Sequence, residues 1–205
     1  MASVLTAKPP AAPATSRSGA IILARHGEPA LSRKVRLNAD EYREFWASYE
    51  VLGLKPGQTP PQSLLRLVGE CGALVASTRL RSIESAQALA GERVFERHEM
   101  LIEAPLPPPR WPKWLRMSPK MWGFWSRVWW WYLNHHEGQE TRRQAETRAD
   151  EAAAMLIRLA EGGEDVVVLA HGFFNFMIGR ALKARGWRLE WSEGYKYWSM
   201  RRFVR

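Results

Sequence analysis

The segment IILARHGEPA, residues 21–30, joins four apolar residues to Arg25, His26 and Gly27. A short apolar run that ends at turn-forming residues is typical of a strand in the interior of a sheet. Two interpretations of the basic residues follow. They are either an incidental strand ending, or side chains that the strand carries to a functional site.

Two further apolar runs end in the same way. ALVAS at residues 73–77 is followed by Thr78, and DVVVLA at residues 165–170 is followed by His171 and Gly172. Helical patterns separate these strands, which predicts an α/β fold, a three-layer α/β/α sandwich with a mostly parallel sheet. Ligands of such sheets bind beyond the carboxyl ends of the strands, so we expect the polar residues after the three runs to meet.

The remaining elements are predicted from apolar periodicity and from start and stop signals. Asn38 or Asp40 can cap the first helix, and Thr141 with Gln144 has the spacing of a capping box. The tail YKYWSMRRFV alternates like an edge strand. We expect helices over 38–54, 62–71, 80–91, 139–161 and 173–186, a polar strand within 93–102, and the edge strand over 195–204.

The amino-acid composition limits which class of protein this chain belongs to and which kinds of partner it binds. The chain has 205 residues, of which 46% are hydrophobic and 25% charged, as in a soluble globular protein. Its net charge of +9 favours anionic partners: phosphorylated small molecules, nucleic acid or an acidic membrane surface. Cys71 is the only cysteine, which excludes an internal disulfide and a cysteine-based metal cluster, and fits a reducing, cytoplasmic compartment.

The ends of the chain differ in composition. Residues 1–18 are rich in Ala, Pro and Ser, and they lack the continuous apolar stretch of a signal peptide. We expect them to form a mobile tail. Residues 19–205 are expected to form one domain, with a tryptophan-rich insertion at about 105–135.

Three motifs together resemble the histidine phosphatase superfamily, the phosphoglycerate mutase-like proteins. LARHGE, residues 23–28, resembles the first motif of that family, and LAHGFFN, residues 169–175, resembles the third. STRLRSIESA, residues 77–86, is similar to the Ser-x-x-x-Arg-(small)-x-x-(Thr/Ser)-Ala motif, with Ser85 where Thr is usual. The resemblance implies the phosphoglycerate mutase-like fold and an activity of the phosphatase branch, with no cofactor.

The resemblance also implies catalytic roles. It assigns the phosphoryl-accepting nucleophile to His26 and the proton donor to Glu103, with Glu28 as the alternative donor. Neutral imidazole is required at the attacking nitrogen, so the other ring nitrogen of His26 should donate to a backbone carbonyl.

The expected phosphate-binding groups are cations and N–H donors. Arg25 and Arg81 can each offer a planar fork to two phosphate oxygens, and His171 adds a further contact. The backbone N–H groups that open the helix after Gly172 add a favourable dipole. His171 is therefore expected to serve both binding and catalysis.

Other candidates have two interpretations each. Glu140 with Arg148 resembles the start of the penultimate helix in many relatives, and an ion pair that holds the helix start explains it equally well. Asn175 either lines the pocket or lies on a helix surface. His135-His136-Glu137 is not expected to bind a metal, because adjacent histidines diverge on a helix and further ligands are lacking nearby.

Two departures from the family pattern favour hydrolysis over a mutase reaction. Ser32 stands where mutases of this superfamily carry Asn, and Ala104-Pro105-Leu106 replaces their Arg-His-Tyr-Gly run. We therefore expect a metal-independent acid phosphatase that hydrolyses a small phosphate ester. The alternative is a catalytically weak phosphate-binding or membrane-surface module of the same fold.

The tryptophan-rich segment is the feature that the motifs leave unexplained. Seven of the eleven tryptophans lie within residues 111–131, and Asp and Glu are missing between Glu103 and Glu137. The segment is too short and too often interrupted by charge to span a bilayer. It is a packed subdomain, a lid that selects an aromatic or lipid-like leaving group, or a peripheral membrane contact through residues 110–132. Nucleic acid is not an expected partner, because a nucleic-acid-binding fold signature is lacking.

Overall fold

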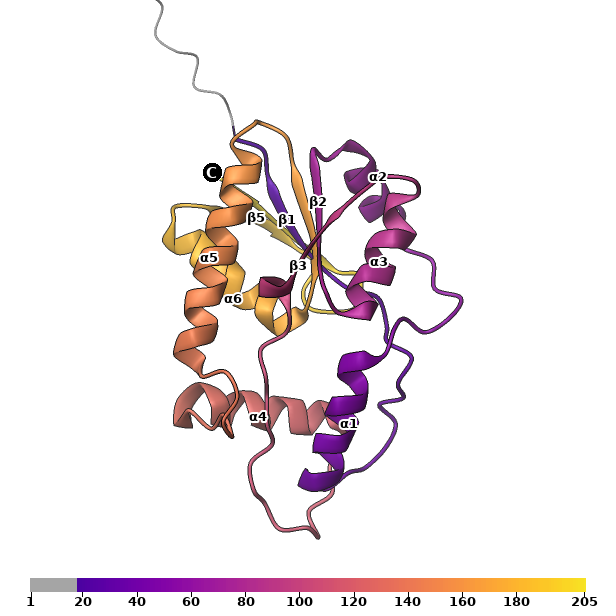
Figure 1. Ribbon diagram of the computed structural model, residues 1–205, viewed down its shortest axis with the longest axis vertical. Helices are drawn as coiled ribbons and strands as arrows, with labels where there is room; N and C mark the ends of the chain where they lie inside the picture. The colour runs from indigo at the N-terminus through magenta and orange to yellow at the C-terminus, as the bar shows by residue number, and fades with distance from the viewer. Residues whose placement is uncertain (1–17) are drawn as a thin grey trace, which may run out of the picture.

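The apolar run at residues 21–25 forms β1, which lies inside a six-stranded sheet of order β3-β2-β4-β1-β6-β5 (Figure 1). The computed structural model describes residues 18–205, so the tail predicted at residues 1–18 falls almost entirely outside it. The strands are β1 (Ile21–Arg25), β2 (Ala73–Ser77), β3 (Glu96–His98), β4 (Val166–Ala170), β5 (Arg188–Ser192) and β6 (Met200–Val204).

The strand pairing confirms the predicted α/β fold with a mostly parallel sheet. β1 and β2 both run parallel to β4, and β3 runs parallel to β2. β6 is antiparallel to both β1 and β5. The prediction of an edge strand at the C-terminus was therefore wrong, because β6 lies between two neighbours and β5 forms the edge.

Both faces of the central strands are covered, which explains their continuous apolar sequences. In β1, Ile21 and Leu23 point into one hydrophobic cluster, whereas Ile22 and Ala24 point into another. β4 alternates in the same way, and all five of its residues are buried. Alternation over two buried faces is the pattern of a sheet between two helical layers.

The helices form these two layers and a third group beyond the sheet. α5 and α6 cover one face, and α2 and α3 cover the other (Figure 1). α1 and α4 lie below the carboxyl ends of β1, β2 and β4 (Figure 1). The helices are α1 (Ala39–Val51), α2 (Gln62–Glu70), α3 (Leu80–Ala90), α4 (Pro119–Leu133), α5 (Arg142–Ala160) and α6 (Gly172–Ala184), with a 3-10 turn at Glu99–Leu101.

α4 is the tryptophan-rich segment, for which the sequence analysis gave no helix. Ser118 caps its first turn, Pro119 occupies the first helical position, and Asn134 ends it in a left-handed conformation. Trp122 is fully buried against Tyr42 of α1 in a third hydrophobic cluster. Within residues 18–205, no helix is long and apolar enough to cross a membrane.

Candidate functional site

The carboxyl ends of β1, β2 and β4 bring the polar residues of the three motifs together. The ring centroids of His26 and His171 are 5.1 Å apart, and both side chains are 1% exposed. Ser77 Oγ lies 2.9 Å from His171 Nε2. These three residues directly follow or end parallel strands, so the sheet alone fixes their proximity.

The His26 ring has one nitrogen fixed by the backbone. Its Nδ1 lies 2.7 Å from the carbonyl oxygen of Gly27, which can only accept, so Nδ1 carries the proton and donates. Burial lowers the pKa of His26 well below its ordinary value of 6.5, and the charges of Arg81 and Arg25 lower it further. At neutral pH the ring is uncharged, and Nε2 bears a free lone pair.

The His171 ring has both nitrogens engaged. The guanidinium of Arg81 donates to Nδ1 at 3.3 Å, so Nε2 carries the proton and donates to Ser77 Oγ. Burial, and then Arg81 and His26, lower the pKa of His171 well below 6.5. His171 is therefore a neutral ring in a fixed orientation beside His26.

Arg81 is placed behind His171 and does not line the cavity described below. Its guanidinium forms an ion pair with Glu50 at 2.8 Å and donates to the carbonyl oxygen of Tyr49. It is completely buried. In this arrangement Arg81 holds the ring of His171 in place and adds positive charge near it. The guanidinium was expected to bind two phosphate oxygens directly, but it pairs with the carboxylate of Glu50 instead.

Arg25 and Arg33 are two of the four cationic side chains that line the cavity, with Lys120 and Arg127. Arg25 donates to the carbonyl oxygen of Tyr195 at 2.6 Å, and its guanidinium lies 4.2 Å from the ring centroid of Tyr197. Arg33 donates to the hydroxyl of Tyr49 at 3.0 Å. The buried Nε atoms of both arginines are without a hydrogen-bond partner in the described structure.

Glu103 lines the cavity and also caps α6. Its carboxylate accepts from the backbone N–H of Phe174 at 2.8 Å and from that of Phe173 at 3.3 Å. The N–H groups that were expected to add a favourable dipole for a phosphate donate to Glu103 in this structure. Glu103 lines the same cavity as His26 and His171.

Glu28 and Ser32 do not line the cavity. Glu28 is exposed and lies 3.7 Å from Lys55 in an ion pair. Ser32 Oγ accepts from the backbone N–H of Lys34 in the turn that follows β1. Their expected place in the pocket is therefore corrected, since the loop directs both outward.

Glu140 and Asn175 also lie outside the cavity. Both carboxylate oxygens of Glu140 accept from Arg148, at 2.8 and 2.7 Å. This contact is the ion pair that one of the two interpretations expected to hold the start of the helix. Asn175 is buried on α6 and donates to the carbonyl oxygen of Ala24 at 3.0 Å. It ties α6 to β1 rather than forming a pocket wall or a helix surface.

The cavity at this site has a volume of about 480 Å³. The strand ends form its floor, and α1, α4 and the start of α6 form its walls. Its lining comprises Arg25, His26, Arg33, Tyr42, Phe45, Trp46, Tyr49, Glu103, Pro119, Lys120, Gly123, Arg127, His171, Gly172, Phe173, Phe176 and Tyr195.

Several of these wall residues were not predicted as site residues. The aromatic residues that repeat along α1 were not predicted to line the site, and Arg33 and Arg127 were missed. Arg33 lies seven residues after His26 in the same loop, which is a readable signal. Arg127 carries no such signal, because only the packing of α4 brings it to the cavity.

His135, His136 and Glu137 are the neighbouring residues whose types could ligate a metal ion. Within residues 18–205, no three His, Cys, Asp or Glu side chains are grouped to hold a metal ion. His135 instead hydrogen bonds to the carbonyl oxygen of Pro108 at 3.1 Å.

Solved structures of known proteins share this fold at low sequence identity. A phosphoglycerate mutase from Bacillus anthracis is 15% identical with a TM-score of 0.58, over 92% of this chain and 88% of its own. A phosphoserine phosphatase variant from Entamoeba histolytica in complex with phosphoserine is 14% identical, with a TM-score of 0.54 over 91% and 90%. The mycobacterial glucosyl-3-phosphoglycerate phosphatase is 19% identical, with a TM-score of 0.51 over 82% and 79%.

The sequence itself gives a family match. No curated protein matches the chain. The profile of the histidine phosphatase superfamily (branch 1) matches residues 63–202, which include the second and third motifs, whereas the His26 motif at residues 23–28 lies outside the matched range. With the three motifs gathered at one end of the sheet, we conclude that the chain belongs to the histidine phosphatase superfamily.

Proposed function

We propose that this protein is a metal-independent phosphomonoesterase that forms a phosphohistidine on His26. One observation carries the proposal. The hydrogen bond from His26 Nδ1 to Gly27 leaves Nε2 unprotonated in a cavity whose floor also bears Arg25. Such a neutral, oriented imidazole beside fixed cations is suited to attack a phosphorus atom.

In the first step, His26 Nε2 attacks the phosphorus of the ester. The Nε2–P bond forms as the P–O bond to the leaving group breaks, and Glu103 in its protonated form gives its proton to the leaving oxygen. Arg25 and Arg33 lie where they balance the charge on the phosphoryl oxygens. The products of this step are the free alcohol and the phosphohistidine.

In the second step, water replaces the alcohol. Glu103, now ionised, accepts a proton from the water as its oxygen attacks phosphorus and the Nε2–P bond breaks. Inorganic phosphate leaves, and both His26 and Glu103 return to their starting protonation states. The net reaction is ester plus water to alcohol plus phosphate.

The test compares variants with an aryl phosphate in the presence of a chelator. We expect phosphate release by the wild-type protein and a loss of at least about 10³-fold in His26→Ala. His98→Ala is the matched control, because His98 is half-buried on β3, pairs with Glu96 and does not line the cavity. Equal rates in wild type and His26→Ala, or abolition of activity by the chelator, would contradict the proposal.

The position of Glu103 also supports a second candidate. Its carboxylate is held by the N–H groups of Phe173 and Phe174, as in a helix cap with no catalytic role. A catalytically weak phosphate-binding module would then release only good leaving groups. Activity on aryl esters together with inactivity on every alkyl ester favours this candidate over the phosphomonoesterase.

The outer face of α4 supports a peripheral membrane contact. Phe124 and Tyr132 are 53% and 77% exposed, and Met121 and Leu133 are also exposed. At 100° per residue, Met121, Phe124 and Tyr132 share one side of the helix, where Lys120 is the exposed charge. A solvent-facing helix side normally carries more polar residues, so this one is suited to a lipid interface.

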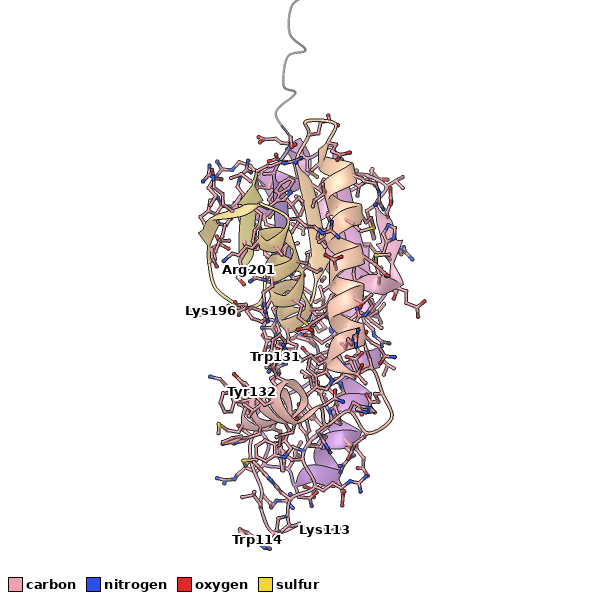
Figure 2. The ribbon with its side chains drawn as sticks, turned by 90° about the vertical axis from the view of Figure 1, so that its left-hand side faces the viewer. Lys113, Trp114, Trp131, Tyr132, Lys196 and Arg201 are labelled. Carbon is pink, nitrogen blue, oxygen red and sulfur yellow. The ribbon has the colours of Figure 1, made fainter. Side chains whose placement is uncertain are left out.

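Charge and aromatic type favour an anionic membrane as the occupant. Figure 2 shows Tyr132 and Lys196 toward the left of the view, and Lys113 and Trp114 at the lower tip of the molecule. Tryptophan and tyrosine concentrate at the headgroup level of bilayers, and lysines are attracted to acidic lipids. We include this contact in the proposal, for a protein located in the cytoplasm as its single Cys71 suggests.

Vesicle co-sedimentation tests the membrane contact. We expect binding to vesicles that contain phosphatidylglycerol, weaker binding to pure phosphatidylcholine, and loss of binding in Phe124→Ser combined with Tyr132→Ser. Val94→Ser is the control, since Val94 is 89% exposed on the loop before β3. Unchanged binding in the double variant overturns the contact, as does concentration-dependent self-association that the double variant abolishes.

A further inference from the structure

The cavity is much larger than a phosphate group needs, and its two zones differ in chemistry. The floor holds His26, His171 and Arg25 at the strand ends. The walls beyond the floor are mainly aromatic. A volume of about 480 Å³ falls within the range of sites that enclose drug-sized ligands. The side chains of the walls therefore indicate which kind of organic group a bound ester would carry.

α1 supplies the first aromatic wall. Tyr42, Phe45, Trp46 and Tyr49 follow the i, i+3, i+4, i+7 spacing of one helix face, and all four line the cavity. Their rings stack along the helix: the centroids of Trp46 and Tyr49 are 5.1 Å apart, and those of Tyr42 and Phe45 are 6.2 Å apart. The wall is thus a continuous row of rings that begins beside Arg33 at Tyr49.

α6 supplies the second aromatic wall. Phe173 and Phe176 stack with ring centroids 6.0 Å apart, and both line the cavity immediately after His171. Phe45, Trp46, Phe173 and Phe176 are only half-buried, unlike the core aromatic residues. They therefore retain apolar surface that a ligand can cover.

The space between these walls is kept open by a glycine of α4. A Cβ on Gly123 would lie 3.5 Å from the hydroxyl of Tyr42 and 3.3 Å from the guanidinium of Arg127. Arg127 itself lies over the ring of Phe173 at 5.3 Å. A side chain larger than methyl at position 123 would occupy the cavity.

The ring faces of the walls offer no partners for hydroxyl groups, and the charged groups between them are Arg33, Glu103, Lys120 and Arg127. The phenolic oxygen of Tyr49 already accepts from Arg33, and that of Tyr42 is buried, which raises the pKa of Tyr42 to about 12. A sugar or polyol phosphate would place its hydroxyls against ring faces and leave them without hydrogen bonds, which is unfavourable. An alkyl or aryl group would replace water on those faces instead.

We propose that this cavity selects phosphate monoesters whose organic part is apolar, either an aromatic ring or an alkyl chain. The phosphate rests on the floor, and the apolar group lies along the rings of α1 and α6. This inference rests on the proposed function for its chemistry, but the binding preference itself does not require turnover.

Alkyl phosphates of different length give the primary test, because their leaving groups have nearly equal chemistry. We compare kcat/KM for ethyl phosphate, octyl phosphate below its micelle concentration, and glycerol phosphate. We expect about a fourfold gain for each methylene that the walls cover, and at least about 10²-fold between ethyl and octyl. A flat series, or a preference for glycerol phosphate, overturns the inference.

Variants of the wall residues test whether the walls cause the preference for longer alkyl esters. Phe45→Ala and Phe176→Ala should each lower the octyl-to-ethyl ratio of kcat/KM by about tenfold, because each removes a ring that covers the longer chain. Phe124→Ala is the matched control, because Phe124 lies outside the cavity on the exposed side of α4. Equal ratios in all three variants contradict the assignment of the walls.

Binding to an inactive variant separates this inference from the proposed function. His26→Ala is titrated calorimetrically with ethyl phosphate and octyl phosphate, with inorganic phosphate as the reference. Tighter binding of the octyl ester supports the walls as a binding site even where turnover is lacking in every variant. Equal affinities overturn the inference although aryl phosphatase activity is present. Phe45→Leu replaces Phe45→Ala where thermal unfolding shows that the alanine variant is not folded.

Discussion

The floor and the walls of the cavity are built in different ways. The floor residues His26 and His171 come directly after β1 and β4, and their positions follow from the parallel pairing of those strands. The walls come from α1, α4 and α6, and their positions follow from helix packing beyond the sheet. Phosphate chemistry is therefore encoded in short local motifs, whereas ligand selection is distributed over tertiary contacts.

This difference predicts two classes of variant. Changes in the floor should reduce the rate for every ester, because all esters share the phosphoryl group. Changes in the walls should alter the ranking of esters while the chemistry of the phosphoryl group is retained. Four experiments test the contrast between the floor and the group formed by helices α1 and α4. They are given from the largest expected effect to the smallest.

His171→Ala should lower kcat/KM about 10³-fold for aryl and alkyl phosphates alike. The substitution removes the ring beside His26 and leaves the buried donors and acceptors of Arg81 and Ser77 without their partner. Steady-state kinetics on a substrate panel measures the effect, with circular dichroism to verify folding. A loss confined to long-chain esters would assign His171 to the walls.

Trp122→Ala should destabilise the fold by about 3 kcal/mol, because a fully buried ring is lost from the cluster between α1 and α4. Urea denaturation measures the free energy of unfolding. Trp114→Ala is the control: Trp114 is 80% exposed, and its replacement should change stability by less than about 0.5 kcal/mol. Equal effects would mean that the layer is not a packed core.

Glu103→Gln should lower the rate for alkyl phosphates about 10²-fold and that for p-nitrophenyl phosphate much less, because only the alkoxide needs a proton. Glu28→Gln serves as the control, since Glu28 is exposed and pairs with Lys55 outside the cavity. The opposite result, with Glu28→Gln selective for alkyl esters, would make Glu28 the proton donor.

The two buried histidines predict how stability depends on pH. Their pKa values in the folded protein are lowered well below 6.5, so the unfolded chain binds more protons once the pH falls below 6.5. The free energy of unfolding should be highest above pH 6.5. It should decrease as the pH falls below this value, by about 1 kcal/mol per pH unit for each histidine. Denaturation at pH 7.5 and 5.5 measures it. His171→Asn should show a shallower decrease than wild type, and an unchanged slope would contradict the assignment.

The sequence predicted the central strands closely, because their apolar runs are continuous and end at turn-forming residues. β2 matches its predicted range, and β1 and β4 differ from theirs at their ends. β5 was not predicted, since Arg188–Ser192 is mostly polar and exposed and carries little periodic signal. The helix of α4 was also not predicted, although Ser118 and Pro119 are an ordinary helix start.

Within the site, the sequence indicated the floor and missed most of the walls. The motifs identified His26, His171 and Arg25, and the structure brings these to one cavity. Arg81 carries the expected motif position but pairs with Glu50, a contact between α3 and α1 that a local pattern cannot contain. Trp122 and Trp130 of α4 are buried, and α4 also lines the cavity through Pro119, Lys120, Gly123 and Arg127, whereas selection of a leaving group by this segment stays a prediction.

The place of β1 in the sheet has a consequence for how the protein is made. Among the strands of residues 18–205, β1 is synthesised first, yet its two neighbours are β4 and β6, which end at residues 170 and 204. One edge of this apolar strand stays unpaired until residue 170 has been synthesised, and the other until residue 204. An unpaired apolar strand edge is a site where chains aggregate, so removal of residues 196–205, which include β6, would leave the strand before His26 with an open edge.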